Sequence, residues 1–402
     1  MSFEKVYVPY GGYWTTPFCR WQGSFANLHA VSFAGEIAVR ALEERQISPE
    51  VFDELLLGMT VPQIHSFYGG PWLAGLVGAT AVTGPMIGQA CATGARVMAT
   101  AAFQIESLEE ERVILTIVTD RCSNGPHCYY PNPFGPGATG DSEDWVWDNF
   151  GYDPWPKNSM LQTAENVAKE AGITKEEQDE VAFLRYKQYD DALKDDSAFL
   201  RRYMVLPIEV RDPSGRKVLA TVEGDEGVYP TTAEGLAKLK PVLEEGTVTY
   251  GTQTHPADGN CAIIVTTREK ARELSRDPEI EIQVLSWGEG RAKKGYMAQA
   301  MVPAARQAIS RAGLTIEDLK VIKTHNPFAV NDIYFSREMG VKVEDMNHYG
   351  SSIVWGHPQG PTGTRLTIEV IEELILLGGG YGMFVGCAAG DSGGAVIVKV
   401  TG

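Results

Sequence analysis

The hydrophobic positions along this chain change their spacing several times, so that runs typical of strands alternate with patterns typical of helices. Before residue 122, short apolar runs predict strands at residues 5–10, 54–59, 88–90 and 113–120. Between these runs, apolar residues three or four positions apart predict helices at residues 27–45, 72–78 and 92–105. This alternation predicts an α/β fold, in which helices cover the faces of a sheet.

The pattern changes in the middle of the chain. Residues 122–159 are rich in Gly, Pro, Asn, Trp and Tyr and show little periodicity. Helical patterns follow at residues 163–172 and 174–194, and the second begins with a capping box, because Thr174 is followed three positions later by Glu177. A long insertion of this kind within a compact fold is usually functional, so the sequence predicts a separate loop domain.

After residue 248 the alternation returns. The expected helices are residues 303–312 and 366–377. The expected strands are residues 261–266, 280–286, 321–324 and 395–400. Both ends of the chain contain comparable material, which suggests an internal duplication, although no residue-level repeat is visible. We therefore expect one half at residues 1–121 with 242–270, a loop domain at 122–241 inserted in it, and a second half at 271–402.

The composition narrows the class of protein. The chain has 402 residues, of which 44% are hydrophobic and 22% are charged, as in ordinary globular proteins. The net charge of −17 argues against binding to nucleic acid or to anionic membranes, and a phosphate-bearing ligand would need a local basic patch or backbone N–H groups. No apolar window is long enough to span a membrane, and the first residues do not resemble a secretory signal. We therefore expect a cytoplasmic protein.

The six cysteines are scattered without a spacing typical of disulfides, so we expect free thiols. Cys122, His127 and Cys128 lie close together in the sequence. No C-x-x-C pair or second group of ligands completes a site around them, so no metal is expected in this chain.

Cys91 follows a stretch of small apolar residues and directly precedes the helix predicted at residues 92–105. The dipole of that helix is expected to stabilise a thiolate and to lower the pKa of the thiol. The unpaired N–H groups at the helix start can also hold an oxyanion. Although a lone buried cysteine is more often part of a core, this position meets two needs of a nucleophile in acyl transfer.

Three further reactive side chains stand in turn-rich segments of the second half, namely His325, His357 and Cys387. A neutral thiol is a weak nucleophile, so a histidine must take its proton. If the bond that breaks joins two carbons, the departing fragment leaves as an enolate, to which a second thiol can give a proton. One cysteine is enough for simple acyl transfer, whereas two indicate carbon–carbon chemistry.

The segments around these residues resemble the motifs of the thiolase family, in order and over nearly the whole chain. The run around Cys91 is similar to the nucleophile motif, and residues 356–358 and Cys387 are similar to the two C-terminal catalytic motifs. Any one match is weak, but all of them in order are specific. Further matching segments are residues 15–18, 23–26, 123–127, 163–168, 176–179, 235–241 and 246–249.

The resemblance implies a set of catalytic roles. Cys91 would be acylated after His357 activates it, and Cys387 would protonate the leaving enolate. The N–H groups of Cys91 and Ala389 would form one oxyanion hole, and His357 would form the other with a water held by His325. The resemblance also implies the thiolase fold, in which two duplicated halves, each a mixed five-stranded sheet layered with helices in the order αβαβα, carry an inserted loop domain.

The chain departs from the family pattern at several positions. Residues 325–329 read His-Asn-Pro-Phe-Ala where many thiolases have Asn-Glu-Ala-Phe-Ala, and they resemble the His-Asp-Cys-Phe variant of the sterol-carrier-protein type. Ala389 supplies an oxyanion donor where glycine is usual. Thr254 takes the place of a serine that contacts pantetheine, and Tyr229 that of an arginine that stacks on adenine. Coenzyme A contacts are therefore expected at Tyr229 and Thr254, without the arginine's charge.

The loop domain is unusually aromatic. Aromatic faces can line a pocket for a ring-bearing acyl group, but they can equally well be core or subunit packing. The composition resembles that of the thiolases of anaerobic aromatic breakdown, such as benzoylsuccinyl-CoA thiolase, which works with a small zinc-finger/OB-type partner subunit. The residues concerned are Tyr129, Tyr130, Phe134, Trp145, Trp147, Phe150, Tyr152 and Trp155.

The sequence therefore favours an acyltransferase that cleaves a 3-oxoacyl-CoA with coenzyme A as a substrate. The resemblance implies a homodimer or larger homo-oligomer. Two alternatives remain open: a decarboxylating condensing enzyme similar to ketoacyl synthases, which needs no second catalytic cysteine, and a non-catalytic acyl-CoA-binding subunit of a larger complex.

Overall fold

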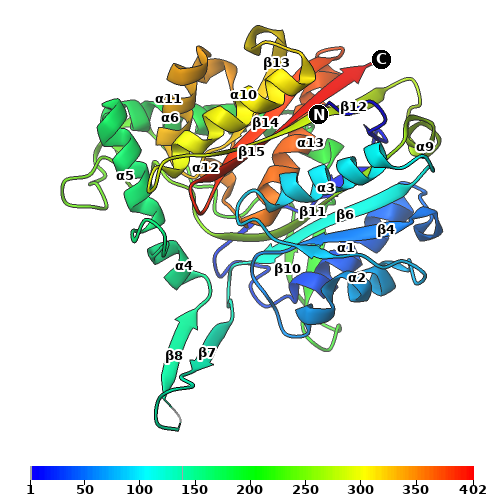
Figure 1. Cartoon of the computed structure of the whole chain (residues 1–402), viewed down its shortest axis with the longest axis horizontal. Helices are drawn as coiled ribbons and strands as arrows, with labels where there is room; N and C mark the ends of the chain where they lie inside the picture. The colour runs from blue at the N-terminus through cyan, green and yellow to red at the C-terminus, as the bar shows by residue number, and fades with distance from the viewer. Residues whose placement is uncertain (1, 138) are drawn as a thin grey trace.

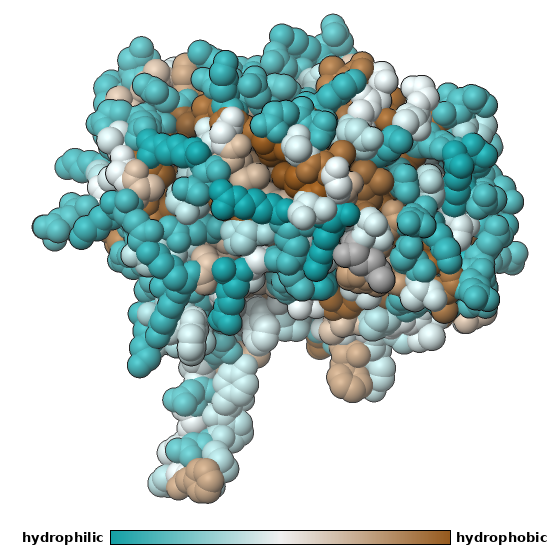
Figure 2. Space-filling model, turned by 45° about the horizontal axis from the view of Figure 1, so that its top comes forward, coloured by the Kyte–Doolittle hydropathy of each residue, from teal (hydrophilic) through white to brown (hydrophobic). Residues whose placement is uncertain are grey.

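The computed structural model describes residues 2–137 and 139–402. The first and last parts of the chain form two stacked blocks of strands and helices, and much of the middle segment extends to one side of them (Figure 1). The surface is mainly hydrophilic, with hydrophobic residues gathered in the centre of the face seen in Figure 2. In the described part of the chain, no helix combines the length and the apolar character needed to cross a membrane.

Strands from both blocks belong to one hydrogen-bonded sheet of 11 strands within the described residues. The C-terminal set runs in the order β13 (Leu319–His325), β14 (Gly380–Ala388), β15 (Ser392–Thr401) and β12 (Glu281–Arg291). The N-terminal set runs in the order β11 (Ala257–Thr266), β6 (Val113–Arg121), β4 (Glu54–Gly58) and β5 (Met86–Ile87), and β2 (Tyr13–Thr15) and β3 (Cys19–Arg20) also pair with β11.

The short strand β1 (Tyr7–Val8) joins the two sets, because Tyr7 pairs with Thr266 of β11 and with Gln283 of β12. Each set has a parallel pair followed by an antiparallel one: β4–β6 and β6–β11 in the first, β13–β14 and β14–β15 in the second. The predicted α/β class with two similar halves is confirmed. The two expected sheets are continuous through β1, since both edges of that strand are hydrogen bonded.

Helices fill the layers on either side of the two sets of strands. Helices α3 (Thr93–Ser107) and α13 (Gly360–Leu376) pack against each other and against strands of both sets, so they form the middle layer (Figure 1). Helices α1 (Ala30–Glu44) and α2 (Gly69–Val77) cover the outer face of the N-terminal strands, and α10 (Met301–Ala312) covers β12 and β15.

Helix α13 is buried on all sides from Gly360 to Leu374, although it carries several charges. A charge can remain in the interior only where it is paired. Arg365 donates to both carboxylate oxygens of Asp225, at 2.7 and 2.8 Å, and to Glu369 at 2.9 Å. Because Asp225 belongs to the middle segment of the chain, this ion pair ties that segment to the central layer.

The middle segment begins with a hairpin that projects away from the body of the molecule (Figure 1). The helix predictions at residues 163–172 and 174–194 are confirmed within a few residues. Glu177 N donates to the Thr174 hydroxyl at 3.3 Å and Thr174 N donates to the Glu177 carboxylate at 2.9 Å, which completes the predicted capping box. The elements are β7 (His127–Pro131), β8 (Gly140–Asp144), α4 (Trp147–Gly151), α5 (Met160–Ala171), α6 (Lys175–Ala192), α7 (Lys194–Ser197), β9 (Ile208–Arg211), β10 (Val218–Val222) and α8 (Ala233–Ala237).

The elements not yet named are α-helices in the second half of the chain and short 3-10 helices along its length. The three domain boundaries expected from the sequence stay a prediction. The α-helices are α9 (Arg268–Leu274), α11 (Ala329–Met339) and α12 (Ser352–Trp355). The 3-10 helices are η1 (Pro49–Val51), η2 (Ser66–Tyr68), η3 (Leu200–Arg202), η4 (Met297–Ala300), η5 (Ile316–Asp318) and η6 (Val343–Asp345).

Candidate active site

Cys91 lies in the tight turn between β5 and α3. The preceding Ala90 has a φ of 42°, in the left-handed region that costs a non-glycine residue energy and is often found at functional sites. Thr93 fixes this turn, because its hydroxyl accepts from Gln89 N at 2.8 Å and donates to Ala90 O at 2.7 Å. The backbone N–H groups of Cys91 and Ala389 lie near enough to the Cys91 sulfur to lower the pKa of its thiol. They are the two donors that the sequence predicts for an oxyanion hole.

The ionisation of Cys91 differs from the sequence prediction. Burial raises the pKa of the thiol to about 11, and the two N–H groups that lower it are too weak to compensate. The prediction of a lowered pKa at this position is therefore wrong. Because the thiol is protonated near neutral pH, it needs a base beside it.

His357 lies in the turn between α12 and α13. Its Nδ1 is hydrogen bonded to the Thr362 hydroxyl at 2.6 Å, and its Nε2 has no hydrogen-bond partner among the described residues. Gly356, with a φ of 88°, precedes it, and a Cβ there would come within 2.6 Å of His255 Cε1. Burial, and then the neighbouring His325, hold the pKa of His357 well below its usual value. The ring is therefore neutral and able to accept a proton.

His325 ends strand β13 and lies against His357, with the ring centroids 4.0 Å apart. Its Nδ1 contacts the Ser352 hydroxyl at 3.0 Å. That hydroxyl donates its proton to Asn326 Oδ1 at 3.0 Å, so it accepts from His325 Nδ1–H. His325 therefore carries its proton on Nδ1 and leaves Nε2 as an acceptor, and Nε2 has no partner among the described residues. Burial lowers the pKa of His325 to about 3.

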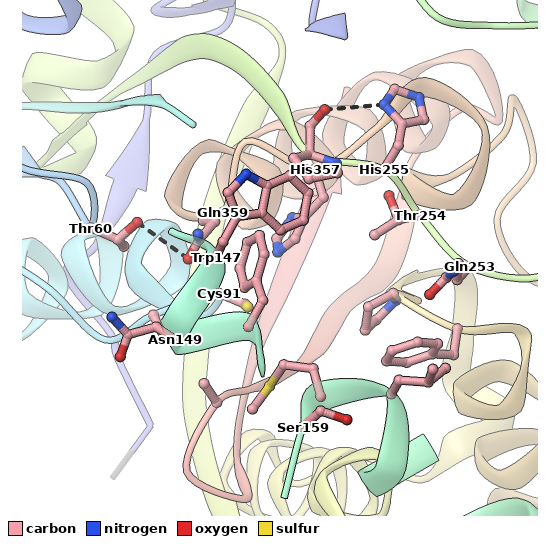
Figure 3. Close-up of a pocket in the computed structure, with 18 of the residues that line it drawn as sticks. Thr60, Cys91, Trp147, Asn149, Ser159, Gln253, Thr254, His255, His357 and Gln359 are labelled. Carbon is pink, nitrogen blue, oxygen red and sulfur yellow. Dashed lines mark hydrogen bonds between the residues drawn. The ribbon is translucent and has the colours of Figure 1, made fainter. Parts of the chain in front are cut away.

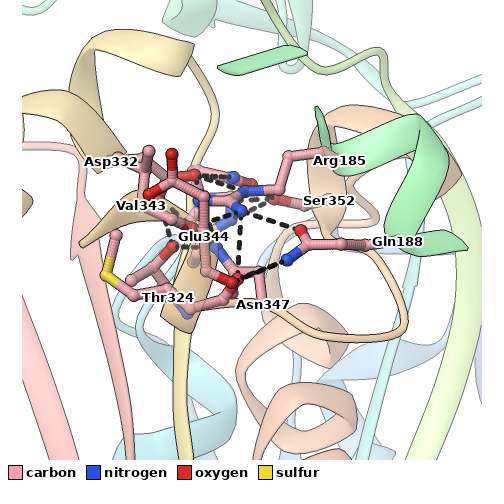
Figure 4. Close-up of polar contacts among 11 residues, drawn as sticks. Arg185, Gln188, Thr324, Asp332, Val343, Glu344, Asn347 and Ser352 are labelled. Atoms are coloured by element: carbon pink, nitrogen blue, oxygen red, sulfur yellow. Dashed lines mark hydrogen bonds and ion pairs between the residues drawn. The ribbon is translucent and has the colours of Figure 1, made fainter. Parts of the chain in front are cut away.

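A buried polar network holds this arrangement in place (Figure 4). Asn326 Nδ2 donates to the Asp332 carboxylate at 2.6 Å, and Arg185 Nε donates to the same carboxylate at 2.9 Å. Asn347 bonds to Thr324, and both also contact Asp332. Since every member is buried, the network fixes the end of β13 and with it the His325 ring.

Cys387 lies at the end of strand β14 and is fully buried. Its Sγ accepts a hydrogen bond from Asn331 Nδ2 at 3.2 Å. Burial raises the pKa of Cys387, and the nearby Cys91 raises it further. The thiol is therefore protonated and able to donate.

The structure thus brings the predicted residues together. The Cys91 sulfur and one ring nitrogen each of His325 and His357 all lie within 4.8 Å of one another. Asn331, Ser352 and Thr362, which hold the reactive groups, were missed by the sequence analysis. No motif marks them, since their roles arise only from contacts with residues of other elements.

A cavity of about 1050 Å³ opens above this cluster, and Cys91, His357 and Ala389 are among the residues that line it (Figure 3). Tyr229 and Thr254, expected to contact coenzyme A, line the same cavity. Figure 3 labels Trp147, Cys91, His357, Thr254 and Gln253 among the residues that line the cavity.

Aromatic side chains form one wall of this cavity. We call Trp21, Trp145, Trp147, Phe150 and Tyr152 the aromatic wall; all five line the cavity. The ring centroids of Trp147 lie 5.0 Å from Trp21 and 5.9 Å from Phe150, in edge-to-face contacts. Of the eight aromatic residues named from the sequence, the other four are outside the cavity lining: Tyr129 and Tyr130 belong to strand β7, Phe134 follows it in the hairpin, and Trp155 contacts Arg291 and Lys294.

Comparison with known proteins agrees with this geometry. The profile of the N-terminal domain of thiolases matches residues 12–269, and that of the C-terminal domain matches residues 279–400. The chain belongs to the thiolase family.

The sequences of similar family members align with nearly the whole chain. Human mitochondrial 3-ketoacyl-CoA thiolase is 29% identical over 392 residues, 96% of each chain. An acetyl-CoA acetyltransferase of Syntrophomonas wolfei is 28% identical over 99% of this chain and 100% of its own. Since these relatives are named for acyl transfer, this member of the thiolase family is an acyltransferase.

Solved structures confirm the thiolase fold. The crystal structure of human mitochondrial 3-ketoacyl-CoA thiolase in complex with CoA has a TM-score of 0.89 and 27% identity, with 100% of each chain covered. The Bacillus anthracis acetyl-CoA acetyltransferase has the same TM-score at 26% identity and 99% coverage of each chain.

Proposed function

We propose that this enzyme cleaves a 3-oxoacyl-CoA with free coenzyme A through an acyl thioester on Cys91, or runs the reverse condensation. The observation that carries this proposal is the cluster of the Cys91 sulfur with His325 and His357 within 4.8 Å, at the floor of a large cavity and beside a second buried thiol. The names of the relatives, 3-ketoacyl-CoA thiolase and acetyl-CoA acetyltransferase, support the same reaction.

In the first half-reaction, His357 Nε2 takes the proton of the Cys91 thiol, and the sulfur attacks the 3-keto carbon of the substrate. The bond between C2 and C3 then breaks. The acyl group stays on Cys91, and the other fragment leaves as the enolate of an acyl-CoA, which takes a proton from Cys387.

In the second half-reaction, free coenzyme A enters and its thiol gives a proton to the Cys387 thiolate. The sulfur of coenzyme A attacks the acyl group and the bond to Cys91 breaks. The Cys91 thiolate takes back the proton that His357 carries, and a shortened acyl-CoA leaves. Asn331 Nδ2, 3.2 Å from Cys387 Sγ, stabilises the thiolate between these two steps.

Developing negative charge needs donors at fixed positions. We assign the N–H groups of Cys91 and Ala389 to the oxygen of the attacked carbonyl, because both are close enough to the Cys91 sulfur to lower the pKa of its thiol. The enolate oxygen would be held by protonated His357 and by a water on His325. That water donates to His325 Nε2, which is an acceptor because Ser352 holds the proton on Nδ1.

Coenzyme A would enter past Tyr229 and Thr254. The Tyr229 side chain is 61% exposed at the cavity, so its ring is free to stack on adenine. The Thr254 hydroxyl donates to Ser352 O at 2.5 Å, which keeps its oxygen as an acceptor for pantetheine. The net charge of −17 makes these uncharged contacts more important, because the surface as a whole repels phosphates.

The acyl group that we propose carries an aromatic ring, as in benzoylsuccinyl-CoA, which would give benzoyl-CoA and succinyl-CoA. In that case the benzoyl group would stay on Cys91 while the succinyl-CoA enolate leaves. The aromatic wall supports this proposal, because edge-to-face contacts favour a planar ring over a flexible chain.

The similarity to the sterol-carrier-protein type, the homo-oligomer, the small zinc-finger/OB-type partner subunit and the cytoplasmic location stay predictions. The alternative of a decarboxylating condensing enzyme is less favoured, because that chemistry has no need of Cys387 and its donor Asn331. Release of carbon dioxide from malonyl thioesters would reverse this order. A non-catalytic acyl-CoA-binding subunit would leave Cys91 unacylated.

Intact-protein mass spectrometry after mixing with a panel of 3-oxoacyl-CoAs tests the proposal. Wild-type protein is expected to gain the mass of one acyl group, and addition of free coenzyme A should remove it. Cys91→Ser should abolish the labile adduct, whereas Cys19→Ser, a matched change of another buried thiol, should not. Equal labelling of the Cys91→Ser variant would overturn the assignment.

A further inference from the structure

The group formed by Cys91, His325 and His357 has a second chemical use besides acyl transfer. Among the described residues, these three side chains offer one sulfur and two ring nitrogens within 4.8 Å of one another. They come from three distant parts of the sequence, so no local spacing could indicate the group. In the sequence, only Cys122, His127 and Cys128 lie close enough together to suggest a metal site. We propose that Cys91, His325 and His357 reversibly bind one divalent transition-metal ion such as Zn²⁺, and that this ion competes with the acyl group for the Cys91 sulfur.

The distances fit such an ion after a small adjustment. Zinc is bound by sulfur at about 2.3 Å and by histidine nitrogen at about 2.0–2.1 Å in tetrahedral geometry. Neighbouring ligand atoms are then about 3.3–3.6 Å apart. The three atoms here, within 4.8 Å of one another, need to approach by about 1.5 Å at most. Rotation of the Cys91 side chain, which lies in a turn and is only partly buried, can bring its sulfur toward the two rings.

The hydrogen bonds of the two histidines support this use independently. A metal-binding histidine normally has its other ring nitrogen hydrogen bonded, which orients the ring. His325 Nδ1 is held by Ser352 at 3.0 Å and His357 Nδ1 by Thr362 at 2.6 Å. In both rings Nε2 is buried and has no partner among the described residues. Buried polar atoms are rarely left unpaired, so the site offers two pre-oriented nitrogen ligands to a metal ion.

The set of donor atoms indicates which ion fits. One thiolate and two imidazoles suit Zn²⁺ and Co²⁺, whereas Mg²⁺ and Ca²⁺ prefer carboxylate and carbonyl oxygens. Three protein ligands also leave a fourth position open. Two of the three ligands, Cys91 and His357, line the cavity of about 1050 Å³, so an ion, a water or the thiol of coenzyme A can reach the group from there. Cys387 is not needed as a ligand, since Asn331 already holds its sulfur.

Binding would change the Cys91 thiol without any redox step. A bond forms between the ion and the sulfur, the S–H bond breaks, and the proton leaves to solvent, so binding strengthens as the pH rises. The bound sulfur can no longer attack a carbonyl, and His357 Nε2 can no longer take a proton. Metal binding does not depend on the proposed function, but its inhibitory effect rests on it.

Cobalt is the probe for the experiment, because tetrahedral Co²⁺ with a thiolate ligand absorbs in the visible and near-ultraviolet ranges. The full-length, metal-free protein is titrated with Co²⁺ without oxygen. One ion per chain is expected, with a thiolate charge-transfer band that Zn²⁺ displaces. Cys91→Ser should remove that band, and His325→Asn should weaken Co²⁺ binding by at least about tenfold.

A matched control uses another histidine of the same cavity. His255 also has a buried Nε2 without a partner among the described residues, but it lies outside the group of three. His255→Asn should bind Co²⁺ as the wild type does, and so should Cys387→Ser. Thermal unfolding of each variant shows that it is folded. Binding that survives in both Cys91→Ser and His325→Asn, or that is lost in Cys387→Ser, would overturn the proposed ligands.

A second measurement separates this inference from the proposed function. Saturating Zn²⁺ should block acylation of Cys91 by acyl-CoA, and a chelator should restore it. If Co²⁺ gives the expected spectrum but acylation continues unchanged, the competition is refuted while the proposed function stands. If the metal-free protein forms no acyl adduct, but added Co²⁺ still gives the expected spectrum, the proposed function fails while the metal site stands.

Discussion

The floor of the cavity is built from buried groups with fixed hydrogen bonds, whereas its aromatic wall is built from half-exposed rings that pack on one another. His325 and Cys387 are 0% exposed and His357 is 5% exposed, and each bonds to a side chain of another element. In the wall, Trp147 is 46% exposed and Tyr152 is 52% exposed. The floor comes from the ends of strands and the start of helices in both halves, and most of the wall comes from one segment, residues 145–152.

This difference suggests a division of work between the two regions. Reacting groups must be held within a few tenths of an ångström, and only packed elements with paired polar atoms achieve this. A pocket for part of a substrate needs shape and apolar area, which a variable segment can supply. Changes in the floor should therefore affect every substrate, and changes in the wall should affect some substrates more than others.

The largest expected effect comes from Cys387→Ser, which removes the proposed acid in the floor. Loss of one positioned acid–base group should lower kcat for 3-oxoacyl-CoA cleavage by about 100- to 10,000-fold, for all substrates alike. Acylation of Cys91 by exchange from a simple acyl-CoA breaks no carbon–carbon bond, so it should remain measurable by mass spectrometry. Equal loss of both reactions would contradict a separate role for this thiol.

The sequence predicts much of this floor but little of what holds it. Cys91, His357 and Cys387 stand in recognisable motifs, so their roles could be proposed before the fold was known. Asn331 and Ser352 could not be found in this way, because each acts through a contact with a residue of another element. The pKa of Cys91 was predicted in the wrong direction, since burial by distant segments outweighs the local helix start.

Secondary structure is likewise hard to predict from the sequence at glycine-rich segments. Strand β14 was not predicted, because its glycines hide the alternation typical of a strand. A Cβ at Gly382 would lie 2.5 Å from Val370 Cγ1, and one at Gly386 would lie 2.9 Å from His325 Cβ. These glycines are needed so that β14 can approach helix α13 and His325 closely. Helix α13 likewise begins at Gly360 and not at the predicted residue 366, since Pro361 in its first turn was taken for part of a loop.

A smaller and selective effect is expected from Trp147→Ala in the wall. The change removes a ring that packs on both Trp21 and Phe150, so a ring-bearing acyl group loses contacts worth about 1–3 kcal/mol. kcat/KM should then fall about 10- to 100-fold for an aromatic 3-oxoacyl-CoA and only slightly for acetoacetyl-CoA.

Trp155→Ala is the matched control for this measurement, because Trp155 is 57% exposed and lies outside the cavity lining. It should leave both substrates unchanged. Equal losses for the two substrates with Trp147→Ala would mean that this ring supports the floor and does not select the acyl group.

The smallest expected effect is a difference in stability between wild type and His325→Asn as the pH falls. Burial lowers the pKa of His325 to about 3, below its ordinary value of 6.5. Between these values the unfolded chain binds more protons at this residue than the folded one. The stability that a neutral His325 contributes is therefore complete above about pH 6.5 and is lost as the pH falls, by about 1.4 kcal/mol per pH unit.

The contribution of Asp120 to stability has the opposite pH dependence, because burial raises the pKa of its carboxyl to about 7. The stability of the wild type alone therefore cannot separate the contributions of Asp120 and His325. Urea unfolding of wild type and of His325→Asn is compared between about pH 6.5 and pH 5, so that the contribution of Asp120, which both proteins share, cancels. The wild type should lose more unfolding free energy than the variant over this range. His65→Asn, an exposed position with a φ of 65° that asparagine tolerates, should follow the wild type. If the curves for wild type and His325→Asn stay parallel, His325 is not held neutral by burial, and the floor is less rigid than its hydrogen bonds indicate.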